Sequence, residues 1–513
     1  MKLKLFLASA LVAGLMNAQT AGDYDTSFGT NGKIIETGAT NPSKLIFSKM
    51  ALQPDGKILV IARGAISGAQ FNIFRYLPNG TKDTSFGTNG SVNITFGAYT
   101  ASPSEIVLQE DGKILIGGAV YPLINSQERH CGIVRLNADG TPDTSFGDMG
   151  RTTFLFESRS EPIDEINRIV VQPDGKIITG GGSYDGTTNR FAVARLNANG
   201  SIDTGFGNNG KQIKLFTVGS PSSVHNMKLL SNGNILLAGN VGNNFGLVKL
   251  LPNGTFDTTF NTTGFKTFTS NLTGNYSTST FFPDNSIMFA GVNSAGQNRF
   301  YKFNADLQPD TTFGTAGNLS LNYSGSTQES NVSKLLLDND GRIFAVASTY
   351  FPGSVLVTTV FCLTSTGSLD NSFSGDGKLA INHGYSTTSP STGILQADHK
   401  LLISGYVSND QFTSVRDGFF TRIHTQMSVL GTGDTKKKAE FAVYPNPAKD
   451  VVTINRLDKT LLNQNIEVVD VTGKLVMKQA VQNENERLNI AHLNTGVYYI
   501  KIGNQVSKKV IKK

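Results

Sequence analysis

The chain has 513 residues, including 55 Gly and no Trp, and only 16% of its side chains are charged. This composition favours many short strands joined by tight turns over long helices. The formal net charge of +6 comes from the ends, because residues 436–513 carry 14 Lys and Arg against 7 Asp and Glu, whereas residues 19–435 carry 29 against 32. A mildly acidic body argues against a surface for phosphate backbones, so we expect no nucleic-acid partner.

The first 18 residues have the three-part form of a secretory signal peptide. Lys2 and Lys4 supply the positive start, Leu5 to Met16 form an apolar run, and Ala18 is a small residue for cleavage before Gln19. The run is short for a membrane span, and no later stretch is long and apolar enough for one. No Cys follows the run, so we expect no lipid anchor and no transmembrane segment.

One phrase, Asp-Thr-Ser-Phe-Gly at residues 25–29, recurs seven times in recognisable form. Its copies begin at Asp25, Asp83, Asp143, Asp203, Asp257, Asp310 and Asp370. Spacings of 53 to 60 residues between successive copies indicate a repeat array rather than separate domains.

Each repeat carries two further signals. The first is an Asp-Gly or Asn-Gly turn between alternating runs, as at Asp55-Gly56, which predicts a hairpin in which Gly takes a positive φ. In the two weak copies of this turn, Asn285 and His399 stand at the Gly position and would have to adopt that conformation. The second signal is an alternating strand that runs into an Asn-Gly turn, as from Phe71 to Gly80.

Together these signals predict four strands per repeat: A and B around the hairpin, C before the Asn-Gly turn, and D after the Asp-Thr-Ser-Phe phrase. Radially repeated four-stranded units are typical of a β-propeller. The chain begins with a D strand near residues 33–37 and ends the array with a C strand near residues 419–424. We therefore predict an all-β, seven-bladed β-propeller over residues 19–428, in which the N-terminal strand completes the seventh blade.

The repeats resemble the delta-60 β-propeller repeats of bacterial secreted proteins over roughly residues 24–426. The resemblance rests on Gln-Pro-Asp-Gly-Lys at 53–57 and 172–176 and on Asp-Thr-Ser-Phe-Gly at 25–29, 83–87 and 143–147. It implies the propeller fold and no particular activity.

Residues 429–438 have the composition of a linker. Beyond it, at residues 439–513, short alternating runs separated by Gly turns predict a small Ig-like β-sandwich. This segment resembles the C-terminal sorting domain of type IX secretion substrates, in its Tyr-Pro-Asn-Pro, Asp-Val-Thr-Gly-Lys and Gly-Val-Tyr-Tyr-Ile-Lys-Ile motifs and its basic last strand. The residues that carry this sorting signal are Pro445, Asn446, Pro447, Gly473, Gly496, Lys512 and Lys513.

The resemblance implies that an outer-membrane type IX export machine recognises the tail and that the tail is usually removed. The mature protein would then be secreted or attached to the outer cell surface of a Gram-negative bacterium. Ig-like tails also serve as spacers or adhesins, which is the alternative for this segment.

Several polar and aromatic positions recur in every repeat, and their repetition argues for a structural role, because an active site needs one asymmetric constellation. Six C strands carry a cation that can pair with the repeated Asp, and the repeated Phe is expected to wedge between blades. The cations are Arg75, Arg135, Arg195, Lys249, Lys302 and Arg422, with Cys362 in the remaining strand. The two cysteines, Cys131 and Cys362, lie four repeats apart, so we expect two buried free thiols.

No motif for a metal, a cofactor or a nucleophile stands out. The six His are scattered singly, Asp338 to Gly341 is best explained as a plain turn, and no Walker loop or Gly-x-Ser-x-Gly motif occurs. Acids such as Glu161 and the neighbouring Asp164 and Glu165 could form a carboxylate pair for glycoside hydrolysis. We assign no catalytic residue, no metal and no cofactor, which favours a non-enzymatic protein and leaves catalysis open.

The B–C and D–A connections share one face of the predicted propeller and vary from blade to blade. Variable loops on a rigid scaffold are where binding residues usually lie. Our candidate ligand-binding residues on this face are Tyr121, Arg129, His130, Arg159, Glu161 and Asp410. The alternative is that these loops are solvated spacers.

We therefore expect a secreted or cell-surface binding or adhesion protein for a glycan or protein ligand. The alternatives are a polysaccharide-acting enzyme, either a glycoside hydrolase or a lyase, and a structural surface-layer component. The absence of Trp weakens the glycan version, although Tyr121 or Tyr184 could stack on a sugar. A deep pocket with a close carboxylate pair would favour the enzyme, whereas a rim of Tyr, Asn and Arg would favour binding.

Overall fold

A computed structural model describes residues 19–38, 44–64, 70–97, 99–121, 128–159, 162–217, 219–270, 272, 278–409, 415–427, 442–455, 464–470, 474–483, 485–502 and 508–513. The chain divides into two compact units, Met1–Ser428 and Val429–Lys513. The expected signal peptide and linker lie outside the described residues. None of the helices in the described part of the chain is long and apolar enough to cross a membrane.

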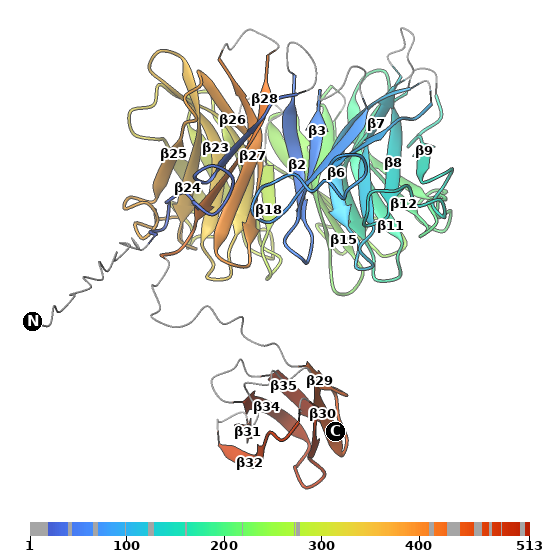
Figure 1. Cartoon of the computed structure of the whole chain (residues 1–513). Helices are drawn as coiled ribbons and strands as arrows, with labels where there is room; N and C mark the ends of the chain where they lie inside the picture. Colours follow the sequence, from blue (N-terminus) through green and yellow to red (C-terminus); the bar gives the residue numbers. More distant parts are fainter. Residues whose placement is uncertain are drawn as a thin grey trace, which may run out of the picture. The chain divides into compact units, whose positions relative to one another are not determined.

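The first unit consists of four-stranded antiparallel sheets arranged as blades around a centre (Figure 1). Six blades take their strands consecutively from the chain. Blades one to three are β2–β5 (Ile46–Leu52, Ile58–Arg63, Phe71–Tyr76, Ser91–Ile94), β6–β9 (Thr100–Leu108, Ile114–Tyr121, His130–Leu136, Arg151–Phe154) and β10–β13 (Ile163–Val171, Ile177–Tyr184, Asn189–Leu196, Lys211–Lys214). Blades four to six are β14–β17 (Ser222–Leu229, Ile235–Val241, Asn244–Leu250, Phe265–Phe268), β18–β21 (Thr278–Phe281, Ile287–Val292, Asn298–Phe303, Asn318–Leu321) and β22–β25 (Gln328–Leu337, Ile343–Phe351, Val355–Leu363, Lys378–Ile381).

The seventh blade joins the two ends of the array. It contains β26 (Thr387–Gln396), β27 (Lys400–Ser408) and β28 (Asp417–His424), and its outer strand is β1 (Lys33–Glu36) from the start of the chain. β1 pairs antiparallel with β28, from Lys33 opposite Thr421 to Glu36 opposite Gly418, and in Figure 1 the dark blue start of the chain lies beside the orange strands. The predicted seven blades and their closure by the N-terminal strand are both confirmed.

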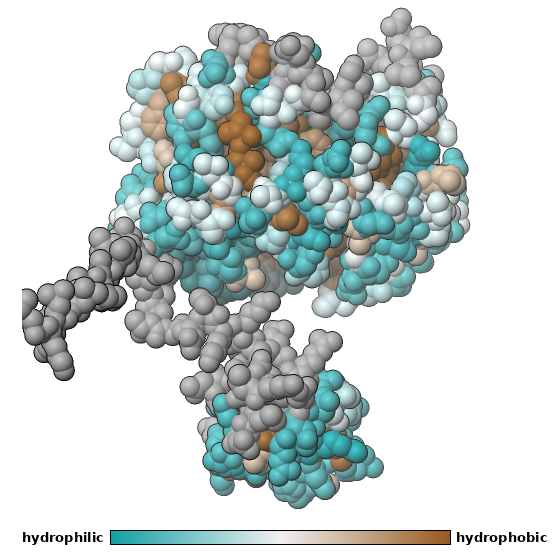
Figure 2. Space-filling view, viewed as in Figure 1, coloured by the Kyte–Doolittle hydropathy of each residue, from teal (hydrophilic) through white to brown (hydrophobic). Residues whose placement is uncertain are grey.

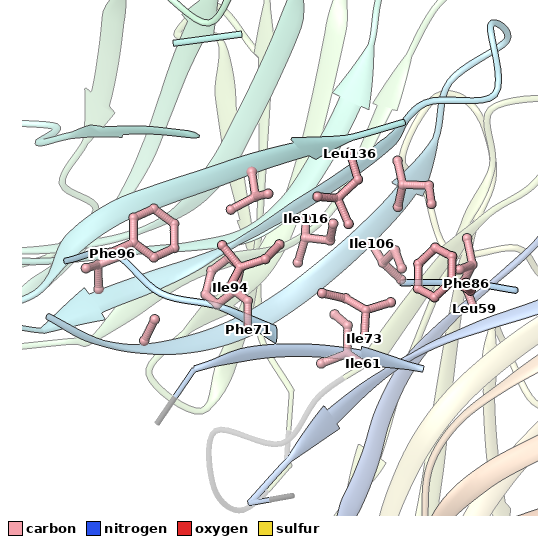
Figure 3. Close-up of a cluster of buried hydrophobic side chains, with 14 residues drawn as sticks. Leu59, Ile61, Phe71, Ile73, Phe86, Ile94, Phe96, Ile106, Ile116 and Leu136 are labelled. Carbon is pink, nitrogen blue, oxygen red and sulfur yellow. The ribbon is translucent and has the colours of Figure 1, made fainter. Parts of the chain in front are cut away.

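The hydrophobic core lies between neighbouring blades. Phe86, for example, is fully buried among Leu59 and Ile61 of blade one and Ile106 and Ile116 of blade two (Figure 3). Six of the seven repeated Phe are fully buried in such clusters, namely Phe28, Phe86, Phe146, Phe206, Phe313 and Phe373. Phe260 is half-buried against the cluster of blades four and five. The visible side of the propeller is mostly hydrophilic, with narrow hydrophobic stretches (Figure 2). Most of the repeated Phe side chains are buried between neighbouring blades, so they wedge the blades together as expected.

The weak copies of the hairpin turn keep the conformation of the strong ones. Gly56 has a φ of 82°, and Asn285 and His399 take φ values of 69° and 59° at the same place. Leu307, where the fifth repeat lacks the Gly of its second turn, has a φ of 58°. Because a left-handed conformation is costly for a side chain with a Cβ, the surrounding blade must hold these three residues in place.

The second unit contains two small antiparallel sheets that share one buried apolar cluster. The first sheet is β29 (Ala442–Tyr444), β30 (Val451–Asn455) and β33 (Glu486–Asn489). The second is β32 (Leu475–Ala480), β31 (Asn465–Asp470), β34 (Gly496–Ile502) and β35 (Lys508–Lys512). This arrangement agrees with the small β-sandwich expected for the tail.

Candidate functional site

The innermost strand of each blade lines a central cavity of about 390 Å³. Its wall is polar, and residues from every blade contribute to it. The lining residues are Lys49, Arg63, Ser104, Asn167, Arg168, His225, Thr278, Asn331, Val332, Ser333, Pro390 and Ser391. A concave site with a few convergent polar groups is where a propeller would be expected to hold a ligand.

Many of these side chains reach the cavity because the inner strands are bulged. The pairing shifts by one residue at Ser104, Asn167, His225, Ser333 and Ser391. In blade one, the pairs Phe47–Ala62 and Met50–Val60 leave Lys49 in the corresponding irregular stretch. A β-bulge leaves one residue outside the ladder and re-aims its side chain, and every one of these residues lines the cavity.

Glycines on the second strand make room for the bulges. A Cβ added at Gly118, Gly181, Gly239 or Gly405 would overlap the backbone carbonyl oxygen of the inner strand, at Ser102, Glu165, Ser223 and Ser389 respectively. Gly inside a strand often marks such a close approach of backbones. The Gly-rich second strands, as in Gly117-Gly118 and residues 180–182, were therefore a sequence signal for the bulges that our sequence analysis did not use.

Hydrogen bonds from one blade to the next form a belt around the cavity. Arg63 Nη2 donates to the carbonyl of Pro103 at 2.8 Å, and Ser104 Oγ donates to the carbonyl of Ile166. Further members of the belt are Asn167 Nδ2 to Ser223 Oγ at 2.9 Å, Asn226 Nδ2 to the Ser279 carbonyl at 2.9 Å and Ser333 Oγ to the Pro390 carbonyl at 2.9 Å. These bonds hold the inner strands, and so the shape of the cavity, in place.

The cavity is rich in positive charge. Lys49 and Arg168 also line a second cavity of about 310 Å³, together with Lys334 and Glu105. Arg168 Nη1 donates to Glu105 Oε2 at 3.0 Å. Burial, with repulsion from Arg168, Lys334 and Arg63, lowers the pKa of Lys49 to about 7, and burial also lowers the pKa of Lys334.

His225 is part of the wall rather than a charged group. Its Nε2 lies 2.7 Å from Asn240 Oδ1. Burial lowers the pKa of His225 to about 4, so the ring is neutral at neutral pH.

Two of the predicted ligand-binding residues lie close to this cavity. The Arg129 guanidinium is 5.4 Å from the centre of the Tyr121 ring, and Arg129 Nη1 lies 3.8 Å from Glu165 Oε2. Arg63, which lines the cavity, interacts electrostatically with Tyr121 and Glu165. Neither Tyr121 nor Arg129 lines the cavity itself, and their role in binding stays a prediction.

The remaining predicted residues of that face are placed differently. His130 lies beside Tyr99, with ring centres 6.1 Å apart, and its Nε2 is 3.7 Å from Glu128 Oε2. Arg159 donates from Nη2 to Ser183 Oγ at 2.6 Å and to Asp164 Oδ1 at 3.3 Å. Glu161 and Asp410 lie outside the described residues.

Two of the acids suggested for hydrolysis, Asp164 and Glu165, have separate partners, and the third, Glu161, lies outside the described residues. Asp164 is fully buried, and its Oδ2 accepts the Phe156 backbone N–H at 2.7 Å. Burial raises its pKa. Its neighbour Glu165 instead pairs with Arg129. Asp164 therefore anchors the loop between blades two and three, and Glu329, also fully buried, accepts the Tyr323 N–H at 2.8 Å in the loop between blades five and six.

The repeated Asp and the cation on the C strand pair in six blades, as expected. The N–O distances are 2.8 Å for Arg75–Asp83, 2.7 Å for Arg135–Asp143, 2.7 Å for Arg195–Asp203, 3.0 Å for Lys249–Asp257, 3.0 Å for Lys302–Asp310 and 2.6 Å for Arg422–Asp25. In blade six, where Cys362 replaces the cation, Arg342 lies 3.7 Å from Asp370.

Both Cys131 and Cys362 are buried free thiols. In the described residues, no group of three or more His, Cys, Asp and Glu could hold a metal ion.

The sorting-signal residues cluster around the last strand of the tail. Asn446 Oδ1 accepts the Ile511 N–H at 2.9 Å, and the Lys513 N–H donates to the Ala448 carbonyl at 2.9 Å. Pro445 and Pro447 flank Asn446 in this segment, Gly496 begins β34 opposite Lys512, and Gly473 lies outside the described residues. The Tyr-Pro-Asn-Pro segment and the basic end of the chain thus lie side by side.

Comparison with protein families agrees with this architecture. The model described as a domain of unknown function (DUF5122) beta-propeller matches residues 53–86, 109–146, 172–206, 230–260 and 339–373. The model of the secretion system C-terminal sorting domain matches residues 442–513. The chain carries DUF5122 propeller repeats and a type IX secretion sorting domain. The sorting domain indicates type IX export to the cell surface or the outside of a Gram-negative bacterium.

Solved structures resemble this chain only distantly, and no curated protein matches it. An inactive virginiamycin B lyase from Staphylococcus aureus is 12% identical, with a TM-score of 0.43 over 76% of this chain and 99% of that chain. Drosophila Semaphorin 1a is 8% identical, with a TM-score of 0.40 over 77% and 88%. PorZ of Porphyromonas gingivalis, a surface component of the type IX system, is 13% identical, with a TM-score of 0.22 over 96% and 86%. None of these likenesses bears on function.

Proposed function

We propose that the exported protein is a binding protein, and that its ligand, a glycan or another protein, enters the central cavity from the variable face. The observation that carries this proposal is the asymmetric cavity in a nearly symmetric ring. Seven similar inner strands contribute different side chains to it, including Lys49, Asn167, His225 and Ser333. Repetition alone would have produced seven equivalent walls, so the differences support a role in recognition.

The rim supports binding rather than hydrolysis. Tyr121 and Arg129 combine an aromatic face with a guanidinium, a pair suited to sugar rings and to polar protein surfaces. Near them, Glu165 is engaged with Arg129, and Asp164 is occupied by the backbone of the preceding loop. Among the described residues, the partners of these two acids are Arg129 and a backbone N–H rather than the second carboxylate that a two-carboxylate glycosidase needs.

A screen of residues 19–513 against a glycan array and a panel of polysaccharides tests this function. We expect retention of at least one ligand without new reducing ends. Tyr121→Ala and Arg129→Ala should weaken that retention about tenfold or more, because each removes a contact at the rim. Glu110→Gln, on the hairpin face of blade two, is the matched control and should leave retention unchanged. Release of new reducing ends would favour the enzyme, and loss of retention in Glu110→Gln alone would move the site to the other face.

A further inference from the structure

The side chains that line the central channel include more cations than acids. Lys49, Arg63, Arg168 and Lys334 line its two cavities, and Glu105 lines the second cavity with three of them. Glu105 is already engaged with Arg168 at 3.0 Å. Arg63, Arg168 and Lys334 all repel the Lys49 ammonium, and Glu105 attracts it. A cleft with low-dielectric walls and charge of one sign concentrates ions of the opposite sign.

Two of the cations have no partner of their own. In the described part of the propeller, no hydrogen bond or ion pair is recorded for the ammonium groups of Lys49 and Lys334. Both side chains are only partly exposed. Buried or half-buried charges are normally paired, because their desolvation is otherwise uncompensated. The remaining cations contrast with them, since Arg63 donates to the Pro103 carbonyl and Arg168 to Glu105 and to the Asn167 carbonyl.

The charged positions of the inner strands share one place in the repeat. In each blade, one backbone N–H donates across the hairpin turn, and it belongs to Gln53, Gln109, Gln172 and Asp338 in blades one, two, three and six. The residue four positions earlier in these blades is Lys49, Glu105, Arg168 and Lys334, respectively. The same place is taken by Asn226, Thr278 and Thr392 in the other blades. The ring therefore presents three cations, one acid and three neutral polar groups at one level of the channel.

The walls change character along the channel. Before this level in the inner strands, the first cavity is lined by Ser, Asn and His side chains with Val332 and Pro390, and Arg63 also lines it. Beyond the level of Lys49 and Arg168, the second cavity is lined by apolar side chains, namely Met50, Leu336, Leu337, Ile394 and Leu395. A ligand that entered from the variable face would thus meet hydrogen-bonding groups and Arg63 first, then the level of Lys49, Arg168 and Lys334, and then the apolar side chains of the second cavity.

We propose that Lys49, Arg168 and Lys334 form the anion-binding end of the ligand site, which takes an oxyanion group such as a carboxylate or a phosphate. This inference rests on the proposed function and deepens it, because it assigns the chemistry of the group that reaches furthest into the channel. Charge-assisted hydrogen bonds from ammonium and guanidinium groups are the strong bonds available to oxyanions. The Ser and Asn side chains above them suit the hydroxyl groups of an acidic saccharide.

Calorimetric titration of residues 19–513 with trigalacturonate, tripolyphosphate and the neutral maltotriose tests the inference. At pH 6 we expect one site per chain for at least one of the two anions and weaker or absent binding of maltotriose. The two anionic probes distinguish a carboxylate source from a phosphate source. Lys49→Met and Lys334→Met should each weaken anion binding about tenfold or more, and the double variant about a hundredfold, because each substitution removes a charged hydrogen-bond donor.

Lys211→Met is the matched control, since Lys211 is also half-buried but lies on the outer strand β13. It should bind the anion as the unchanged protein does, and thermal unfolding should show that all variants are folded. Absence of anion binding, or an unchanged affinity in the double variant, would overturn the inference. If the double variant still retains a ligand from the glycan screen, the proposed function stands without the anion site. If the anions bind but the screen yields no ligand, the proposed function fails and the anion site stands.

Discussion

The repeated aspartates show how one side chain joins several parts of a blade. Asp143 accepts the Ser145 N–H at 3.1 Å, pairs with Arg135 at 2.7 Å on the C strand, and lies 3.3 Å from Lys113 after the hairpin turn. Burial by itself would raise the pKa of Asp143, but the bonds from Ser145, Arg135 and Lys113 outweigh it and hold the pKa well below its usual range. The same geometry recurs around the ring, so these residues act as structural clamps.

Replacing one of these aspartates should lower the free energy of unfolding by an amount that depends on its partners. We expect Asp143→Asn to lower the free energy of unfolding by about 3–5 kcal/mol at pH 7, because it leaves the Arg135 charge uncompensated. Asp370→Asn is the matched variant in blade six and should cost less, since Arg342 lies 3.7 Å away and the Asp370 side chain is 19% exposed. Urea denaturation measures both. Equal costs would contradict the role of the close pair.

The clamps also predict how stability depends on pH. Asp25, Asp83 and Asp143 have pKa values lowered in the folded protein. A lowered folded pKa stabilises the protein above the unfolded value, and this stabilisation is lost as the pH falls towards the folded value. We therefore expect the thermal unfolding midpoint to fall steadily below about pH 4. Asp143→Asn should flatten this dependence, and an unchanged slope would mean that other acids dominate.

Lys49 makes the channel sensitive to a different pH range. Its pKa of about 7 means that it is charged below neutral pH and loses its proton as the pH rises. The groups around it are Arg63, Glu105, Arg168 and Lys334, and His225 is neutral in this range because its pKa is about 4. We expect the affinity for an anionic probe to fall between pH 6 and pH 8. Lys49→Met should remove most of that dependence, and calorimetry at several pH values measures both.

Among the elements, the first strand has the largest structural task. β1 completes blade seven, and Phe28, just before it, is buried between blades one and seven with Phe74 and Phe420. The strand thus joins the first residues of the array to the last, and it covers an edge of β28 that would otherwise be open for pairing with another chain.

Phe28→Ala should reveal how much this closure contributes. We expect a loss of about 3–5 kcal/mol in unfolding free energy, the range for deleting a fully buried Phe. Phe260→Ala is the matched substitution of the half-buried copy and should cost clearly less. Urea denaturation of the two variants measures the difference. A larger loss from Phe260→Ala would show that burial between the blades is not what the repeated Phe contributes.

At the scale of the whole molecule, the two units have separate tasks. Each has its own buried clusters, and the family comparisons assign the repeats to residues within the first and the sorting domain to residues 442–513. The propeller therefore has a core that does not require the tail.

Deleting residues 442–513 should stop export without unfolding the propeller. We expect the shortened protein to accumulate in the periplasm, because the export machinery recognises the tail, and to keep the thermal unfolding transition of the propeller. Cell fractionation and surface proteolysis measure the first effect, and calorimetry measures the second. Arrival of the shortened protein at the cell surface would contradict the role of the tail.

The repeat spacing, the turn residues and the motifs of the tail were enough to predict the number of blades, the closing strand and the sorting domain. These features depend on local chemistry, such as a positive φ at Gly56, and on a period that appears directly in the chain. The clamps around Asp143 could be inferred for the same reason, since both partners recur at fixed places. Of the six residues chosen on the variable face, Tyr121 and Arg129 contact each other, and their role in binding a ligand stays a prediction.

Only the tertiary structure decided what the channel contains. Lys49, Arg168 and Lys334 are about 120 and 170 residues apart in the chain, and ring closure brings them to one level of the channel. The bulges that place Asn167 and His225 in its wall depend on pairing with strands whose Gly residues, Gly181 and Gly239, allow the close approach. The repeat period shows which residues occupy equivalent positions in the blades. Only the closed ring brings these residues together around one axis, and this produces the positive charge of the channel.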